Sequence, residues 1–469
     1  MTNANSKTEK SGKLDLFAIS WPIFVETALM TLIGTLGLWM AGHVSPAAVA
    51  IFGLSNQLRA MFDRLFRVVG IGTSVVVTQH RGAGDTDGAR AVARAGFAAS
   101  VWTGLAALLL VGIWPRALLR LLQLPAELMD LAIPFIAVVG VALALDSINI
   151  TMFSVLRAFT FTKDSMRLVM AMNILHVLVS FPLVFGFGPM PALGLMGLGY
   201  GLLASRSLVF VLLVIMWARR LGIVLRWRDA LIVPREPLAA ITHIGLPSAG
   251  EKIAFRLCFI ATVAMAGSMG ASALATHAYA MNVISIINIV VVALGAGSEI
   301  IIGHHVGAGH LRKAGGVLLR ALRISLLATF VGSVLAWLIA PHAVSALNNR
   351  PDISALLSTI LLIEIITGLG RTTNVIVMGG LRATGDARWP VKISVAVNVG
   401  LGTALAWLLG VHFAWGLPGL WIGYLADECV RGLAMWLRWH YLGWTTQARA
   451  ARRRILNKRR AVALAQGLV

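Results

Sequence analysis

The segment GIGTSVVVTQHRGAG at residues 70–84 recurs as GAGSEIIIGHHVGAG at residues 295–309, so residue 70 matches residue 295 at an offset of 225. The same offset relates residues on both sides of this segment: Pro22 and Pro247, Glu26 and Glu251, Met40-Ala41-Gly42 and Met265-Ala266-Gly267, Asn149 and Asn374, Arg157-Ala158 and Arg382-Ala383, and Asn173 and Asn398. Solenoid repeats are far shorter, so this repeat indicates a duplicated half-molecule, and each half is expected to form one bundle.

The composition is that of a membrane protein. Of the 469 residues, 58% are apolar and only 13% are charged, and many apolar runs approach the ~20 residues that cross a bilayer. We therefore predict an all-α polytopic membrane protein of twelve transmembrane helices, six in each half. The expected spans are 16–40, 47–76, 92–113, 130–156, 168–187, 194–217, 239–266, 272–304, 316–341, 354–380, 390–411 and 416–441.

Arginine and lysine gather in alternate loops, whereas the loops between them, such as 186–193, 267–271 and 411–416, are short and nearly uncharged. Positive loops remain inside, so both termini are expected in the cytoplasm of a protein of the plasma (inner) membrane. An even number of spans per half gives two like-oriented bundles, related by an axis along the membrane normal. The predicted organisation is a cytoplasmic segment at 1–15, an N-terminal lobe at 16–217, a connector at 218–238, a C-terminal lobe at 239–441 and a basic cytoplasmic tail at 442–469.

The net charge of +21 does not indicate nucleic-acid binding, because most arginines fall in the loops predicted to be inside. Anionic lipid headgroups are the expected partner, with the tail as an anchor beside them. The two cysteines, Cys258 and Cys429, lie inside predicted spans, which argues against a disulfide framework. The first apolar run is too long for a cleavable signal and is expected to remain as the first span.

The segment 244–310 resembles the multidrug and toxic compound extrusion family, and its first-half twin at 19–85 resembles it equally. The likeness covers roughly residues 15–441. It rests on order, spacing and duplication, because no single motif is specific. The residues that carry it are Gly245-Leu246-Pro247, Ala275-Thr276-His277 within Ala273 to Asn282, the 303–309 segment, Glu364, Arg371, Asn374, Leu381-Arg382, Gly385-Asp386, the run from Gly416 to Trp421, and Asp427-Glu428 with Arg431.

This resemblance implies a transporter whose two six-helix lobes enclose a central cleft that opens alternately to either side. Inward Na⁺ or H⁺ movement would drive the solute out. The residue-based prediction agrees, because two like-oriented bundles that meet at mid-membrane have the geometry expected for alternating access, and polar groups at their interface are the candidate sites.

Glu251 lies about eleven residues into its span, roughly 16 Å along the helix and well inside the hydrocarbon. A carboxylate there must face a cavity, pair with a cation or be protonated. It is either the cation-binding carboxylate of the C-terminal lobe or a structural partner of Lys252 or Arg256. Glu26, its repeat partner, is either a second cation site or a capped or water-facing carboxylate.

The resemblance gives mixed support to these two carboxylates. Members of the family often have an acidic residue in the span of Glu251. They commonly also have an aspartate in the first span near Gly37, where this chain reads Gly34-Thr35-Leu36-Gly37-Leu38. This departure argues against a proton mechanism built on that aspartate.

Arg59, Asp63 and Arg67 lie four residues apart in the second span and hence on one helical face. Their repeat counterparts Ile284, Asn288 and Val292 are uncharged, so the stripe belongs to the N-terminal lobe alone. Asp63 is the third cation-coupling candidate. The stripe is either a structural ladder, with Glu26 supplying part of the missing negative charge, or a cleft lining that contacts an acidic or zwitterionic solute.

In the tenth span Glu364 and Arg371 are seven residues apart, and Asn374 follows one turn later. In the repeat, Asp146 corresponds to Arg371 and Asn149 corresponds to Asn374. Asp146 and Asn149 are therefore three residues apart, as Arg371 and Asn374 are. We regard these five residues, with Arg59 and Arg67, as candidates for the substrate cleft. The reversal of charge between the lobes leaves two alternatives: Asp146 and Arg371 meet across the interface, or each packs within its own lobe.

Other charged residues are expected to be structural. Glu299, Asp427 and Glu428 resemble pairs that lock helices or lobes together. Adjacent histidines on a helix point in different directions, so His304 and His305 are expected at a cytoplasmic helix end and not in a metal site.

The predicted function is a secondary active antiporter that exports small organic molecules, needs no cofactor besides Na⁺ or H⁺ as the coupling ion, and works as a monomer. A flippase for lipid-linked saccharide or lipid remains the alternative, because it would have duplicated bundles and basic cleft residues as well. An intramembrane enzyme needs a nucleophile with its base or a metal cluster, and the spans show neither pattern.

The arginine asymmetry generates a topology prediction. A cysteine introduced at Arg228, within the connector, should be protected in intact cells from a membrane-impermeant thiol reagent and labelled only after the membrane is opened, because the connector is expected to be cytoplasmic. Labelling of this cysteine from the periplasm would refute the topology.

Overall fold

The structure is a computed structural model that describes residues 14–187, 191–348 and 350–465. Its first half forms the N lobe, which is built from six long helices. These are α1 (Leu16–Gly42), α2 (Pro46–Gly82), α3 (Thr86–Ile113), α5 (Met129–Ala158), α6 (Thr162–Phe185) and α7 (Leu195–Met216), which continues as the π-helical turn η2 (Trp217–Leu221).

The second half forms the C lobe in the same order. Its long helices are α9 (Arg235–Ser268), α10 (Ala271–Ala308), α11 (Leu311–Asn348), α12 (Pro351–Ala383) and α15 (Gly416–His440). The remaining span is one helical rod that alternates between α and π geometry: α13 (Arg388–Val397), η3 (Asn398–Thr403), α14 (Ala404–Trp407) and η4 (Leu408–His412). All twelve predicted helices are therefore present.

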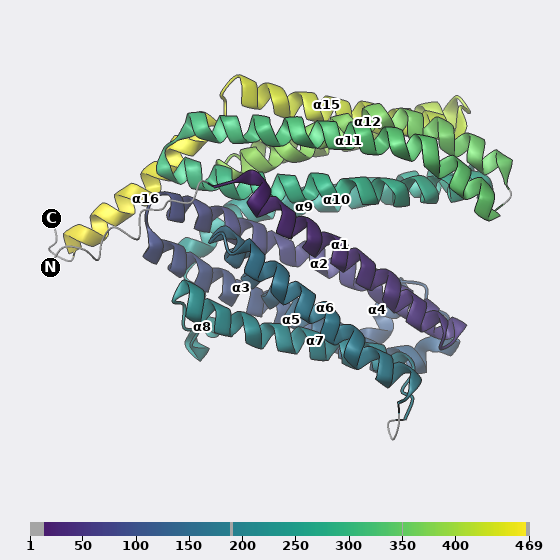
Figure 1. The fold of residues 1–469 in the computed structure, drawn as a ribbon, viewed down its shortest axis with the longest axis horizontal. Coiled ribbons are helices and arrows are strands. Elements are labelled where there is room, and N and C mark those ends of the chain that lie inside the picture. The colour runs from purple at the N-terminus through teal and green to yellow at the C-terminus, as the bar shows by residue number, and fades with distance from the viewer. Residues whose placement is uncertain (1–13, 188–190, 349, 466–469) are drawn as a thin grey trace.

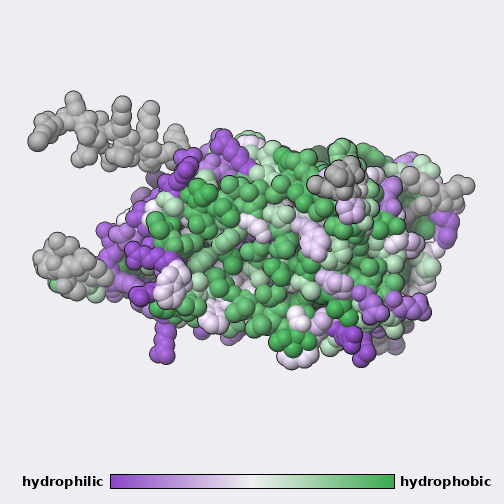
Figure 2. Space-filling model, turned by 90° about the horizontal axis from the view of Figure 1, so that it is seen from below, coloured by the Kyte–Doolittle hydropathy of each residue, from purple (hydrophilic) through white to green (hydrophobic). Residues whose placement is uncertain are grey.

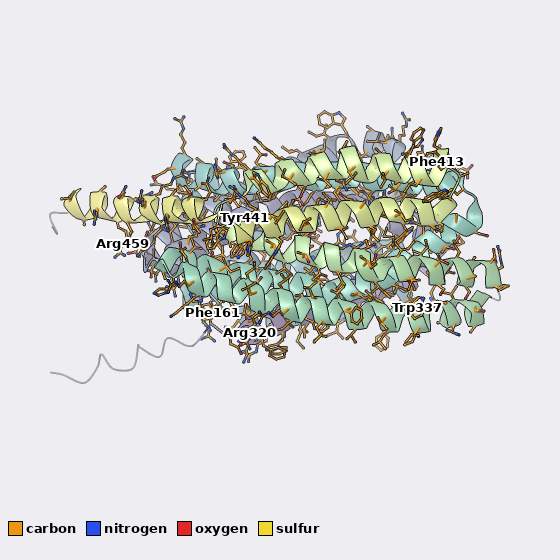
Figure 3. The ribbon with its side chains drawn as sticks, turned by 90° about the horizontal axis from the view of Figure 1, so that it is seen from above. Phe161, Arg320, Trp337, Phe413, Tyr441 and Arg459 are labelled. Atoms are coloured by element: carbon orange, nitrogen blue, oxygen red, sulfur yellow. The ribbon has the colours of Figure 1, made fainter. Side chains whose placement is uncertain are left out.

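Several shorter elements were not predicted: α4 (Pro115–Leu121), η1 (Ala126–Leu128), α8 (Trp227–Leu231) and α16 (Thr445–Ala465). The basic tail is thus helical over much of its length. Its Lys458 Nζ lies 2.7 Å from Glu236 Oε2 at the start of α9, and Arg459 donates a hydrogen bond to the Ala83 carbonyl. Figure 3 shows Arg459 on α16, beyond the main helical body.

Within the described residues, nine helices are long and apolar enough to cross a membrane by length and composition. The other three long helices, α2, α9 and α15, carry the groups Arg59-Asp63-Arg67, Glu251-Lys252-Arg256 and Asp427-Glu428-Arg431. Figure 2 shows a broad hydrophobic region across the middle of one face, with hydrophilic residues toward both ends. These three helices therefore carry charged groups within segments that otherwise have the length of membrane spans.

Both lobes begin at the same end of the molecule, which we call the basic end; α1 begins there and α16 leaves from it (Figure 1). The interface between the lobes is formed chiefly by α1 and α2 against α9 and α10. The lobes meet at the basic end and diverge toward the opposite end (Figure 1). The like orientation expected from six spans per half is therefore confirmed.

At the basic end the first helix of each half packs into the other lobe. Leu16 and Ile19 of α1 belong to the apolar core around α10 and α12. Ile241 and Ile244 of α9, which occupy the corresponding repeat positions, belong to the core around α2, α3 and α5. All four side chains are less than 6% exposed, so close van der Waals packing holds this contact.

Two glycines allow the lobes to approach closely. A Cβ at Gly82 would collide with the carbonyl oxygen of His304, and one at Gly307 would collide with that of Gln79. The repeat relates Gly82 to Gly307 and Gln79 to His304, so each lobe inserts the same glycine against the same position of its partner.

The same two polar residues also bond across the interface. Gln79 Nε2 donates to the Ala383 carbonyl at 2.8 Å, and His304 Nε2 donates to the Ala158 carbonyl at 2.9 Å. Ala158 and Ala383 are repeat partners. These reciprocal bonds and the glycine contacts form what we call the basic-end latch. The expectation that His304 lies at a helix end is confirmed. Its hydrogen bond to the other lobe was not predicted.

The latch depends on the absence of a side chain at Gly307. Gly307→Ala should push the lobes apart at the basic end, because the new methyl would overlap backbone atoms that do not move independently. Spin labels at exposed Arg94 and Arg312, in a background without the two native cysteines, should report a longer or broader distance distribution. Gly315→Ala is the control, since a Cβ there meets nothing within 4 Å. An unchanged distribution in Gly307→Ala would contradict the role of the latch.

Candidate functional site

The predicted charged stripe of α2 is divided between two environments. Arg67 Nε bonds Asp63 Oδ2 at 2.8 Å, and the two side chains are 53% and 41% exposed. Arg59 turns away into the N lobe, where its guanidinium lies 3.5 Å from Asp146. Asp63 therefore does not bridge two guanidinium groups. The Asp63–Arg67 pair lies beside the interface, because Arg67 interacts electrostatically with Lys252 of the C lobe.

Asp146 is shared between two arginines of the N lobe. Arg206 Nε on α7 lies 2.7 Å from Asp146 Oδ1, closer than Arg59. Asn149 donates a hydrogen bond to the Arg206 backbone carbonyl and so fixes α5 against α7. The sequence analysis did not single out Arg206, although one arginine in the apolar span 194–217 is the signal that would have identified it.

Glu26 is buried and paired. Its carboxylate is 2.7 Å from the guanidinium of Arg157, and the residue is 4% exposed. The alternative of a capped or water-facing carboxylate is therefore wrong. Arg157, assigned to a loop by the sequence, is helical because α5 extends to Ala158. Arg67 is within electrostatic range of Glu26, but the direct ion pair of Glu26 is with Arg157.

The repeat places Glu251 and Arg382 at the positions of Glu26 and Arg157. They do not pair directly, because Arg382 bonds Glu299 at 3.2 Å. Among the described residues, Glu251 makes no hydrogen bond or ion pair with its side chain, and it lies near the midpoint of α9 in a half-buried position. Basic groups such as Lys252 and Arg382 act on it only at longer electrostatic range. The alternative in which Glu251 pairs directly with Lys252 or Arg256 is thus not seen among the described residues.

The C lobe contains a chain of alternating charges on α12 and α15. Arg371 lies 2.6 Å from Glu364 and 3.3 Å from Glu428, and Glu428 lies 3.1 Å from Arg431. Asp427 completes the chain at 2.5 Å from Arg431. All of these side chains are largely buried, which requires near-complete pairing.

These contacts decide between two of the predicted alternatives. Asp146 and Arg371 do not meet across the interface; each pairs within its own lobe. Asn374 donates to Glu428 at 3.4 Å and belongs to the C-lobe network. Glu428 joins α15 to α12 through Arg371. Asp427 pairs with Arg431 within α15 and accepts a hydrogen bond from Asn398 of η3, so both acids hold helices together, as expected for structural pairs.

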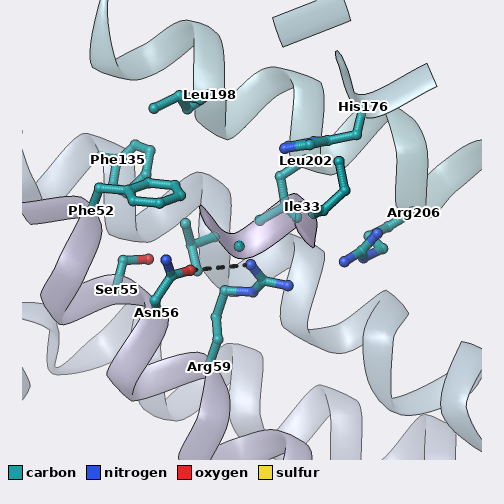
Figure 4. Close-up of a pocket in the computed structure, with 12 residues that line it drawn as sticks. Ile33, Phe52, Ser55, Asn56, Arg59, Phe135, His176, Leu198, Leu202 and Arg206 are labelled. Atoms are coloured by element: carbon teal, nitrogen blue, oxygen red, sulfur yellow. Dashed lines mark hydrogen bonds between the residues drawn. The ribbon is translucent and has the colours of Figure 1, made fainter. Parts of the chain in front are cut away.

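Each lobe contains one cavity of note. The N-lobe cavity has a volume of about 30 Å³, and its mostly apolar wall includes the polar residues Asn56, Arg59, His176 and Arg206 (Figure 4). The C-lobe cavity, of about 10 Å³, lies beside the π-helical segment η3, with Asp427 and the Thr262–Tyr424 hydroxyl pair in its wall. Both lie within bundles, where ligand sites of helical proteins commonly occur.

A family model described as MatE matches the chain twice, over residues 22–181 and 247–408. The two matches coincide with the two repeats. The chain is 31% identical over 435 residues to an uncharacterized transporter, YisQ, of Bacillus subtilis, with 93% of this chain and 96% of the relative covered. It is 28% identical to a probable multidrug resistance protein, NorM, of Pseudomonas aeruginosa, covering 90% and 88% of the two chains.

Solved structures show the same fold. A multidrug resistance MATE family transporter in an outward-facing conformation superimposes with a TM-score of 0.82 at 18% identity, covering 92% of this chain and 96% of that one. A mutant of the Vibrio cholerae MATE transporter VcmN gives a TM-score of 0.83 at 20% identity, with 91% and 96% covered. Sequence, duplication and fold agree: this chain belongs to the MatE family of multidrug and toxic compound extrusion transporters, and it is a multi-pass membrane transporter and not an enzyme.

Proposed function

We propose that the protein is a secondary antiporter of the plasma membrane that exports small organic solutes while Na⁺ or H⁺ moves inward. The basic end would face the cytoplasm, in keeping with the distribution of arginine and lysine. The latch would then hold the lobes together on the cytoplasmic side, and the lobes diverge toward the outside (Figure 1). Relatives named multidrug resistance proteins support organic solutes as the cargo.

The observation that carries this proposal is the unequal state of the two repeat-related carboxylates. Glu26 is neutralised by Arg157, whereas the Arg382 that would neutralise Glu251 is held by Glu299. A carboxylate without a direct partner near the middle of a membrane helix is costly unless it binds a cation or a proton. Glu251 therefore has the property required of a coupling group, and Glu26 and Asp63, which already have basic partners, are secondary candidates.

The energetics of exchange suit this arrangement. Glu251 can hold a cation or proton while the cleft faces outward and lose it when solute enters from the cytoplasm. Each unit charge that moves inward through the full field contributes about 2.3 kcal/mol per 100 mV. At about 1.4 kcal/mol for each factor of ten, this supports a solute gradient of between one and two orders of magnitude.

A transport assay in vesicles can identify the coupling ion. Liposomes that contain the purified protein should accumulate or release an organic solute when a Na⁺ gradient or a pH gradient is imposed. The gradient that drives solute movement identifies the coupling ion. A solute flux that depends on neither gradient would contradict the antiport mechanism. A flux confined to lipid-linked cargo would favour the flippase alternative.

Removal of the charge of Glu251 tests its role directly. Glu251→Gln keeps the shape and hydrogen-bonding capacity of the side chain but cannot titrate, so we expect gradient-driven efflux to be abolished while folding and some solute binding remain. Glu236→Gln is the matched control, because Glu236 is exposed at the basic end and paired only with Lys458 of the tail among the described residues. Full ion-driven transport by Glu251→Gln would shift the assignment to Glu26 or Asp63.

The half-exposed Asp63–Arg67 pair predicts an effect on substrate choice. Arg67→Ala should reduce transport of acidic or zwitterionic compounds more than transport of lipophilic cations, because it removes positive charge beside the interface. The loss of stability should be small, about 1 kcal/mol or less, as for other accessible ion pairs. Arg320→Ala, on the outer surface of α11 (Figure 3), serves as the control. Equal loss for every compound together with a lower melting temperature would indicate a structural ladder.

A further inference from the structure

The cavity inside the N lobe is lined by side chains from five helices. Arg59, Asn56 and Ser55 come from α2, His176 from α6 and Arg206 from α7, while α1 and α5 supply mainly apolar wall. Figure 4 shows the Arg59 guanidinium beside Asn56, with His176 and Arg206 on the other side of the cavity. Its cavity volume of about 30 Å³ leaves room for a water molecule or a small ion.

Positive charge at this cavity exceeds negative charge by one. Arg59 and Arg206 share a single carboxylate, that of Asp146. The other acids of the lobe interior are occupied elsewhere: Asp63 bonds Arg67, and Glu26 bonds Arg157. The side chains of Arg59 and Arg206 are only 24% and 5% exposed. A buried guanidinium without a full counter-charge is strongly unfavourable in the hydrocarbon region.

The C lobe shows how the same arginine is compensated when acids are present. The repeat partner of Arg206 is Arg431, which bonds both Asp427 and Glu428. The positions in the N lobe that correspond to these two acids are Leu202 and Leu203. The duplicated arginine has therefore kept its buried place in the N lobe without the two carboxylates that accompany its counterpart.

A buried polar group points to the same cavity. His176 is 5% exposed, and its Nδ1 has no hydrogen-bond partner among the described residues. Arg59 Nε is likewise buried without a partner in this part of the chain. Unsatisfied buried polar atoms of this kind need a ligand or ordered water, and beside a net positive charge an anion satisfies both requirements.

We propose that this cavity binds one monovalent anion between Arg59 and Arg206, with His176 in its wall. The ligand chemistry is that of a carboxylate or a halide, held by charge-assisted hydrogen bonds from the guanidinium groups. The source is either the carboxylate of a transported solute or inorganic chloride. The site is separate from Glu251, and it does not depend on the proposed ion coupling.

The test is the thermal stability of the purified full chain at constant Na⁺ concentration and ionic strength, with a bulky sulfonate buffer anion, which is neither a halide nor a carboxylate, as the reference. Replacement of this sulfonate by chloride, acetate or benzoate should raise the melting temperature in a saturable manner, because a ligand that binds only the folded state stabilises it. Saturation by chloride alone identifies a resident inorganic anion. Saturation by the carboxylates, with or without chloride, identifies a subsite for acidic solutes.

Variants assign the effect to the cavity. Arg206→Gln and Arg59→Gln each leave Asp146 with one arginine, so the anion dependence should disappear in both. Asp146→Asn doubles the surplus charge, and the anion concentration for half-maximal stabilisation should fall by at least about tenfold, the change that corresponds to 1.4 kcal/mol. Arg320→Gln, which removes an exposed arginine outside the cavity, should behave as the unmodified protein.

Two results would overturn the proposal. One is the absence of saturable anion dependence in the unmodified chain. The other is an unchanged dependence of the melting temperature on the anion in Arg206→Gln or in Arg59→Gln, provided that the variant folds. Both readouts are made without a gradient, so a failure of antiport would leave the anion site standing, and the reverse is also true.

Discussion

The neutralisation of charge inside a bilayer is the constraint on which the rest of this structure depends. A charged side chain in hydrocarbon persists only if it pairs, reaches water or holds an ion. Most of the interior ion pairs here join different helices, for example α1 with α5 through Glu26 and Arg157, and α12 with α15 through Arg371 and Glu428. The ion pairs therefore favour the packing of particular helices against each other, and they also stabilise that packing.

The duplication makes departures from pairing easy to recognise. At the latch the two lobes repeat the same contacts, with Gly82 and Gly307 against the partner backbone and Gln79 and His304 donating to the repeat-related alanine carbonyls. Where one lobe has changed a residue, a charge is left over: Glu299 in place of Ser74 removes Arg382 from Glu251, and Leu202 and Leu203 leave Arg206 short of acids. One lobe thus carries an uncompensated carboxylate and the other an uncompensated guanidinium, which gives the two halves of a symmetric fold different chemistry.

The sequence predicted the architecture well and the contacts less well, for identifiable reasons. Apolar length and the repeat define where helices lie along the chain, so all twelve were found. Contact partners depend on the rotation of each helix and on which neighbours are close, and neither follows from spacing alone. Asp146 and Arg371 match in the repeat yet face separate lobe interiors. Arg206 is a single arginine in an otherwise apolar span, so its partner Asp146 does not follow from the local sequence, and Arg157 lies just beyond the predicted span 130–156 because α5 continues to Ala158.

The reciprocal form of the basic-end latch has a mechanical consequence. A single contact between two rigid bodies acts as a pivot, about which they remain free to swivel. Two separate contacts define an axis, and they leave rocking about that axis as the easy motion. The contacts of Gly82 and Gly307 lie about one helical turn apart along α2 and α10, so they define a short axis, and a small rotation about this axis would give a large displacement at the far ends of these helices, which are 37 and 38 residues long.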